Sequence, residues 1–102
     1  MVNNVTISGI VVTPILEHEL RGGGTYLSLR LKNDSKKGKI AETIYVRVNV
    51  FSDSQKRICR ERGMEQGDRV WVSGELMARN EDETGRDIIE IRAHQLDRVV
   101  EA

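Results

Sequence analysis

The feature that most constrains this chain is a strict alternation, over residues 44–51, of aliphatic side chains with aromatic or polar ones. Successive side chains of a β-strand point to opposite faces of the sheet. One face of this segment is wholly aliphatic, and it consists of Ile44, Val46, Val48 and Val50. The other face consists of Tyr45, Arg47, Asn49 and Phe51. The pattern predicts a strand with one buried face and one face of unusual composition.

The same period of two recurs over residues 5–12, 25–32, 69–79 and 87–96, which predicts further strands. Residues expected to face the core are Val5, Ile7, Gly9, Val11, Thr25, Leu27, Leu29, Leu31, Val70, Val72, Gly74, Leu76, Ala78, Ile89, Ile91 and Ala93. Glycines within two of these strands, Gly9 and Gly74, suit the strong bends of a small barrel.

The segments between the strands have the composition of turns and of one helix. Thr13-Pro14 predicts a break, 21–24 a glycine-rich turn, 33–42 a polar lysine-rich loop and 80–86 a hairpin turn. Ser52 and Gln55 have the spacing of a capping box, which predicts a helix from Asp53 to about Arg62 that ends at Gly63.

The predicted order is three strands, a helix and two strands. This order predicts an all-β fold, a five-stranded Greek-key OB barrel with one short helix between strands 3 and 4. A small split β-sandwich is the alternative. A chain of 102 residues is expected to form one domain, residues 1–102.

The outward face of the 44–51 strand is the candidate binding surface. Tyr45 and Phe51 offer flat rings and Arg47 a guanidinium, and bases stack on such side chains for roughly 1–3 kcal/mol each. The alternative is that both rings pack under a loop or against a second subunit. The neighbouring strand would extend this surface, and further candidates are Tyr26, Arg30, Lys32, Lys36, Lys37, Lys39, Trp71 and Arg79.

These further candidates also have alternative interpretations. The lysines of 33–42 either contact phosphates or belong to an ordinary solvated loop. Trp71 either stacks on a base or, as we favour, anchors a subunit interface.

Charge is unevenly distributed along a chain whose formal net charge is zero. Residues 30–39 hold five basic side chains against Asp34, whereas 81–90 hold five acidic side chains against Arg86. Separated charge predicts one side that attracts a polyanion and one that repels it. Solvated loops that differ in sign would give the same pattern.

No residue pattern indicates catalysis, a cofactor or a metal. His18, His94 and Cys59 are too few for a standard zinc site, and no nucleophile elbow, P-loop or HExxH motif occurs. His18 is expected in a loop or at a strand edge. Cys59 is interpreted as a buried core residue, although nearby basic side chains could lower its pKa.

The single cysteine, the absence of a signal-peptide pattern at Met1 and the absence of a long apolar run predict a cytoplasmic protein without a membrane partner.

Three segments carry a resemblance to a known family. They are residues 2–9 (VNNVTISG), 43–51 (TIYVRVNVF) and 66–76 (QGDRVWVSGEL). In order and spacing the chain resembles the bacterial single-stranded DNA-binding protein family over nearly its whole length. The resemblance implies an OB fold, single-stranded DNA as partner, and DNA contacts at Tyr45, Arg47 and Phe51. It also implies a homodimer or homotetramer with an interface at residues 4–10.

The chain departs from the family pattern in two places. Glu81 stands where many members have a tryptophan, and the sequence stops at Ala102 without the long disordered tail and acidic tip of many members. In length it is similar to the short primosomal replication protein, and a plasmid or phage member also fits. The main hypothesis is sequence-nonspecific single-stranded DNA binding in replication, recombination or repair. The alternative is an accessory OB module that binds replication or primosome proteins and holds nucleic acid weakly.

Overall fold

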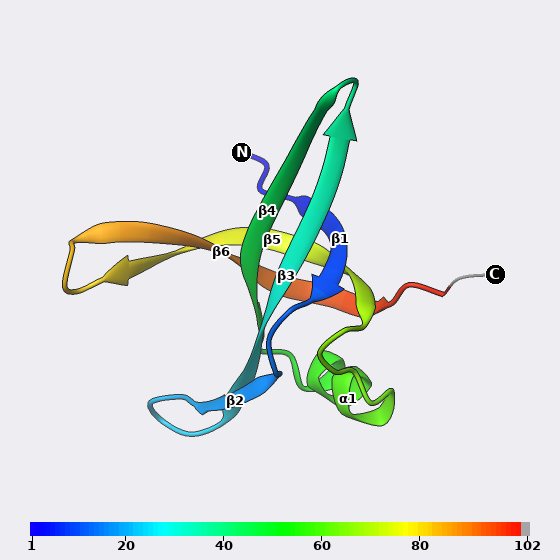
Figure 1. Ribbon diagram of the computed structural model, residues 1–102. Coiled ribbons are helices and arrows are strands. Elements are labelled where there is room, and N and C mark those ends of the chain that lie inside the picture. Colours follow the sequence, from blue (N-terminus) through cyan, green and yellow to red (C-terminus); the bar gives the residue numbers. More distant parts are fainter. Residues whose placement is uncertain (101–102) are drawn as a thin grey trace.

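The structure, a computed structural model, describes residues 1–100; the last two residues of the predicted domain lie outside the described part. It contains strands β1 (Val5–Val11), β2 (Leu16–Glu19), β3 (Thr25–Lys37), β4 (Ile40–Val50), β5 (Arg69–Glu81) and β6 (Arg86–Arg98), and helix α1 (Asp53–Glu61). Figure 1 shows two long hairpins, β3–β4 and β5–β6, that project from a small curved sheet in different directions.

The strands form one sheet in the order β1-β5-β6-β4-β3-β2. A further pairing of β1 with β3, at Ile10–Lys32 and Val11–Leu31, closes β1, β5, β6, β4 and β3 into a barrel. All pairings are antiparallel except the one between β4 and β6. The predicted five-stranded OB barrel with one helix between its third and fourth strands is thereby confirmed.

Apolar side chains from every barrel strand, from α1 and from the segment that follows α1 fill the barrel. The buried cluster consists of Val11, Leu27, Leu29, Leu31, Val48, Val50, Cys59, Met64, Val70, Val72, Ile91, Ala93 and Leu96. Both strand glycines, Gly9 and Gly74, lie where neighbouring strands approach closely. A Cβ on Gly9 would lie 2.5 Å from the Lys32 carbonyl oxygen, and one on Gly74 would lie 2.0 Å from the Arg92 carbonyl oxygen.

Two predictions about the hairpins are wrong. Residues 33–42 are not a loop: β3 runs to Lys37, β4 begins at Ile40, and Gly38 makes the turn with a φ of 62°. Beyond the barrel both faces of these strands are solvated, so no hydrophobic alternation marks them. The second wrong prediction concerns burial. Four predicted core residues, which lie where β4, β5 and β6 extend beyond the barrel, are exposed: Ile44, Leu76, Ala78 and Ile89.

The sequence did not predict strand β2, which pairs with β3 on its outer side and forms an edge of the sheet. Its polar composition, with Glu17, His18 and Glu19 in a row, suits a short edge strand. The expected break at Pro14 precedes it, and the expected glycine-rich turn follows it.

Helix α1 covers one end of the barrel, and its limits agree with the prediction. Ser52 occupies the N-cap position but makes no side-chain cap bond, so the predicted capping box does not form. Gln55 Oε1 instead accepts a hydrogen bond from the Leu96 backbone nitrogen at 3.1 Å. Gly63 follows the helix with a φ of 58°. Within residues 1–100, no helix has the length and apolar character that crossing a membrane requires.

Candidate nucleic-acid interface

The outward faces of β3 and β4 form one continuous surface because the two strands pair antiparallel in register. Lys32 lies opposite Tyr45, Arg30 opposite Arg47, and Ser28 opposite Asn49. Tyr26 and Phe51 follow at the barrel end of the same strands. We call this surface the β3–β4 face: Tyr26, Ser28, Arg30, Lys32, Tyr45, Arg47, Asn49 and Phe51. The register thus brings together six of the predicted site residues.

Three aromatic rings on this side of the sheet stack in a row that crosses three adjacent chain segments. The ring centroids of His18 and Tyr26 are 4.8 Å apart, and those of Tyr26 and Phe51 are 4.9 Å apart, each pair inclined by 24°. The Nε2 atom of His18 lies 2.7 Å from the Ser28 hydroxyl, which fixes the ring at the outer end of the row. Tyr26 therefore lies between two rings, and the three side chains form one continuous aromatic stack on this surface.

Two guanidinium groups lie over aromatic rings of this surface. The Arg30 guanidinium carbon is 5.6 Å from the Tyr45 ring centroid, and that of Arg92 is 5.7 Å from the Phe51 centroid. Arg92 is also held by Glu75, with 2.9 Å between Nη1 and Oε1. The Tyr45 side of the surface is open, since this residue is 52% exposed. A flat ring beside a cation is the arrangement on which a nucleobase and its phosphate can bind together.

A buried carboxylate lies beneath the arginines. Glu90 of β6 is only 2% exposed, and its Oε1 accepts a hydrogen bond from Asn49 Nδ2 at 2.9 Å. Its Oε2 lies 3.3 Å from Arg79 Nε and 3.6 Å from Arg47 Nε. A buried carboxylate needs such partners, because desolvation without them is costly. Glu90 thereby holds Arg47 and Arg79, from β4 and β5, on the same side of the sheet.

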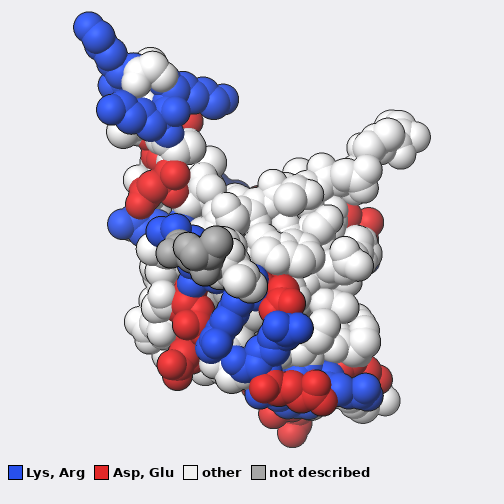
Figure 2. Space-filling model, turned by 90° about the vertical axis from the view of Figure 1, so that its right-hand side faces the viewer, with Lys and Arg blue, Asp and Glu red and all other residues white. Residues whose placement is uncertain are grey.

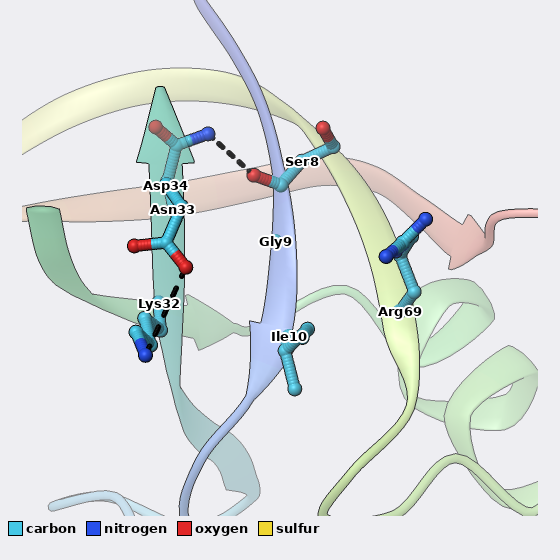
Figure 3. Close-up of a pocket in the computed structure, with 7 residues that line it drawn as sticks. All are labelled: Ser8, Gly9, Ile10, Lys32, Asn33, Asp34 and Arg69. Carbon is cyan, nitrogen blue, oxygen red and sulfur yellow. Dashed lines mark hydrogen bonds and ion pairs between the residues drawn. The ribbon is translucent and has the colours of Figure 1, made fainter. Parts of the chain in front are cut away.

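The structure places Lys32 at the seam of the barrel, where β1 and β3 diverge. A cavity of about 320 Å³ opens there, and Figure 3 shows the residues that line it: Ser8, Gly9, Ile10, Lys32, Asn33, Asp34 and Arg69. The Lys32 ammonium lies 3.8 Å from the Asp34 carboxylate. Asn33 donates from Nδ2 to the Ser8 carbonyl oxygen at 2.7 Å, which bridges the diverging strands. Lys32 therefore has an acidic neighbour in the free protein.

The three predicted phosphate-binding lysines, Lys36, Lys37 and Lys39, lie at the far end of the β3–β4 hairpin and are exposed. Figure 2 shows basic side chains gathered at this tip, well clear of the body of the protein. The hairpin continues the strands of the β3–β4 face, so a polyanion that follows these strands outward would reach the tip.

The structure does not bring Trp71 to the β3–β4 face. Trp71 of β5 lies opposite Ser8 of β1 and Asp97 of β6, and β6 separates it from β4. It is half-buried there. Its role in DNA stacking or in a subunit interface remains a prediction.

Sequence reasoning missed three residues of this surface: His18, Glu90 and Arg92. Their place on this surface follows from strand register, since His18 pairs with Tyr26, and Arg92 with Asn49. The sequence around each residue does not indicate that it belongs to the site. Glu90 stands among acidic residues that suggest a solvated hairpin, yet it is buried beneath its two arginines.

The surroundings of Cys59 correct one prediction and confirm another. Burial raises the pKa of the thiol from 9.0 to about 11 and outweighs the lowering effects of a backbone hydrogen bond and of Arg60. The side chain is buried and lies in the core, as expected.

Among the described residues there is no group of three or more side chains suited to a metal ion.

Comparison with known proteins assigns this architecture to a family. The sequence profile of the single-strand binding protein family matches residues 2–99. A search of the curated protein sequences finds no significant match.

Solved structures of similar fold include a Plasmodium falciparum SSB in complex with ssDNA, with a TM-score of 0.80, 18% identity and coverage of 98% of this chain and 97% of that one. They include the mitochondrial single-stranded DNA binding protein Rim1 of S. cerevisiae, with a TM-score of 0.76, 15% identity and coverage of 98% and 96%. They also include a small single-stranded DNA-binding protein of Streptomyces coelicolor, with a TM-score of 0.75, 20% identity and coverage of 98% and 96%. At these identities the likeness concerns the fold.

Proposed function

Since the chain belongs to the single-strand binding protein family, we propose that it binds single-stranded DNA across the β3–β4 face, by base stacking combined with phosphate contacts. Single-stranded DNA binding follows from family membership, and members of this family are binding proteins, not enzymes. The residues and the mechanism are our proposal. Stacking reads only the flat face of a base, so binding of this kind is independent of sequence.

The observation that carries the proposal is the pairing of Arg30 with Arg47. Like charges directly opposite each other on neighbouring strands destabilise a sheet. Arg47 shares the Glu90 carboxylate, so Arg30, beside the open Tyr45 ring, carries the charge that an added anion would complete. A phosphodiester backbone supplies that anion, and its bases supply the partners for the rings.

The side chains divide between two roles in this proposal. Tyr45 and Phe51 stack on bases, with Tyr26 and His18 behind Phe51. A base that stacks on the other face of Phe51 takes the place of the Arg92 guanidinium there. Arg30, Arg47, Arg79 and Arg92 contact phosphates or flank the stacked bases. Lys32 and the lysines of the hairpin tip (Lys36, Lys37 and Lys39) extend the phosphate contacts, each adding to the salt dependence of binding.

Assembly into a homodimer or homotetramer is part of the proposal. From Val5 to Gly9, strand β1 has its ladder partner in β5, and its pairing with β3 begins at Ile10. The other edge of residues 5–7 therefore offers backbone groups to a second subunit, whereas the Ser8 carbonyl oxygen is already bonded to Asn33. Residues 5–7 fall within the interface proposed at residues 4–10. Trp71, opposite Ser8, would lie close to such an interface.

We further propose that residues 1–102 act as one single-stranded DNA-binding module in the cytoplasm, in replication, recombination or repair. The buried Cys59 thiol is compatible with a reducing compartment.

Titration of a fluorescent oligo-dT at several salt concentrations tests the proposal. Phosphate-driven binding to a single strand gives a log K that falls with log salt by about 0.7 per phosphate engaged. We expect binding at low salt, a slope that corresponds to several phosphates, and little difference between oligo-dT and a mixed-sequence strand. Absence of binding at low salt would refute the proposal.

A further inference from the structure

The acidic tip of the β5–β6 hairpin has no part in DNA binding as described above. Glu81, Asp82, Glu83 and Asp87 gather around the turn that Gly85 closes, against Arg86 alone. Glu81 is half-buried and the others are exposed. These carboxylates would repel phosphates, so the acidic tip is not expected to bind DNA.

The two hairpin tips carry opposite charge on arms of the same construction. The basic arm ends in Lys36, Lys37 and Lys39, and the acidic arm ends in residues 81–83. In Figure 1 the two arms leave the barrel in different directions, so the basic tip of one molecule does not lie beside its own acidic tip. Complementary charge on two diverging arms suits contact between different molecules.

Each arm also bears exposed apolar side chains on the face that continues the core. On the basic arm Ile40 is 64% exposed and Ile44 is 47% exposed. On the acidic arm Leu76 is 46% exposed and Ile89 is 55% exposed. Ala78 and Ile89 lie directly opposite each other in the β5–β6 ladder, so the apolar side chains of this arm share one face. Apolar side chains grouped on a projecting arm indicate an interaction surface.

We propose that the basic β3–β4 arm of one copy binds the acidic β5–β6 arm of a second copy. Lysine ammonium groups then pair with carboxylates at the tips, and the aliphatic side chains of the two arms pack behind them. The contact joins two different surfaces, so it can propagate from copy to copy or close into a ring. It is distinct from the expected interface at residues 4–10, which lies on β1.

Sedimentation velocity without DNA tests this contact, and it does not depend on the proposed DNA site. Exposed charges are weakly screened at about 20 mM salt and strongly screened at about 500 mM. We expect the wild-type protein to form larger species at low salt that disappear at high salt. A wild-type protein with the same sedimentation coefficient at both salt concentrations would overturn the proposal.

Charge reversal identifies the arms. Reversal of the acidic tip (Glu81→Lys, Asp82→Lys and Glu83→Lys) or of the basic tip (Lys36→Glu, Lys37→Glu and Lys39→Glu) replaces attraction by repulsion. Either variant should weaken the low-salt association by at least about tenfold. A control variant reverses three exposed acidic residues outside the arms, Glu19→Lys, Glu61→Lys and Glu65→Lys, with the same change in net charge as the acidic-tip variant. It should retain the association.

Restored complementarity is the decisive result. The two tip variants, each weakened in its own association, should associate when mixed, since one has two basic arms and the other two acidic arms. Circular dichroism establishes that both are folded. If the folded variants fail to associate when mixed, or if the control variant loses association as the tip variants do, the arms are not the contact.

Discussion

Arg30 of β3 lies directly opposite Arg47 of β4, with Tyr45 beside Arg30 and the carboxylate of Glu90 beside Arg47. The two arginines therefore differ in how far they are neutralised before any ligand binds. Arg47 shares a buried carboxylate, whereas Arg30 interacts with a ring. This difference makes distinct predictions for the two positions.

Replacement of Arg30 by alanine should weaken oligo-dT binding and reduce the salt slope by about 0.7 if one phosphate contact is lost. The fold should tolerate the change, because the repulsion across the strand pair is removed as well. Fluorescence titration over a salt series measures both quantities. Arg57→Ala, an exposed position of α1, is the matched control and should leave the slope unchanged. An unaltered slope in Arg30→Ala would show that this arginine does not contact phosphate.

Replacement of Glu90 by glutamine should have opposite effects on stability and on binding. The amide nitrogen would face the donors of Asn49, Arg47 or Arg79, so the free energy of unfolding should fall by about 1–3 kcal/mol. The two arginines would lose their shared carboxylate, so oligo-dT affinity should rise. Urea unfolding and DNA titration of the same preparation measure the two effects. Weaker binding by a folded variant would mean that Glu90 serves the site by orienting the arginines.

Replacement of Gly74 by alanine should destabilise the barrel by about 2 kcal/mol or more. The new Cβ would meet the Arg92 carbonyl oxygen at 2.0 Å, at the place where the β5–β6 register shifts. Ser73→Ala, at the adjacent position, should have a much smaller effect. Thermal or urea unfolding distinguishes them, and equal stabilities would contradict the close approach.

Much of the barrel could be predicted from segments in which every second residue is aliphatic, because these aliphatic residues face the core. Leu27, Leu29 and Leu31 and the pair Val48 and Val50 are buried as expected. Alternation does not show where a strand leaves the barrel, so it predicts burial for Ile44 and Ile89, which lie beyond the core and are exposed. Register between strands distant in sequence is not encoded locally either. The stacking of His18 on Tyr26 and the cover of Arg92 on Phe51 could therefore be found only in the structure.

The buried Cys59 thiol makes a prediction about alkaline pH. Its pKa is raised from 9.0 to about 11 by burial, so the folded state retains a proton that the unfolded state releases above pH 9. Its contribution to stability is thus fully present below pH 9 and is lost as the pH rises to about 11, on the order of 3 kcal/mol in total.

Urea unfolding of the wild type and of Cys59→Ala between about pH 8 and 10.5 isolates this contribution, since the other titrating groups are common to both. The wild type should lose more stability than the variant over this interval. Parallel pH profiles would indicate that the thiol pKa is not raised in the fold.

The central claim is that the rings of Tyr45 and Phe51 bind bases, and one measurement tests it most directly. Oligo-dT affinity is compared between the wild type, the variant Tyr45→Ala with Phe51→Ala, and the variant Tyr45→Phe with Phe51→Tyr, which keeps both rings. We predict that the alanine variant binds more weakly by roughly 2–5 kcal/mol while remaining folded, and that the ring-keeping variant binds nearly as the wild type does. Wild-type affinity in the folded alanine variant would contradict the account.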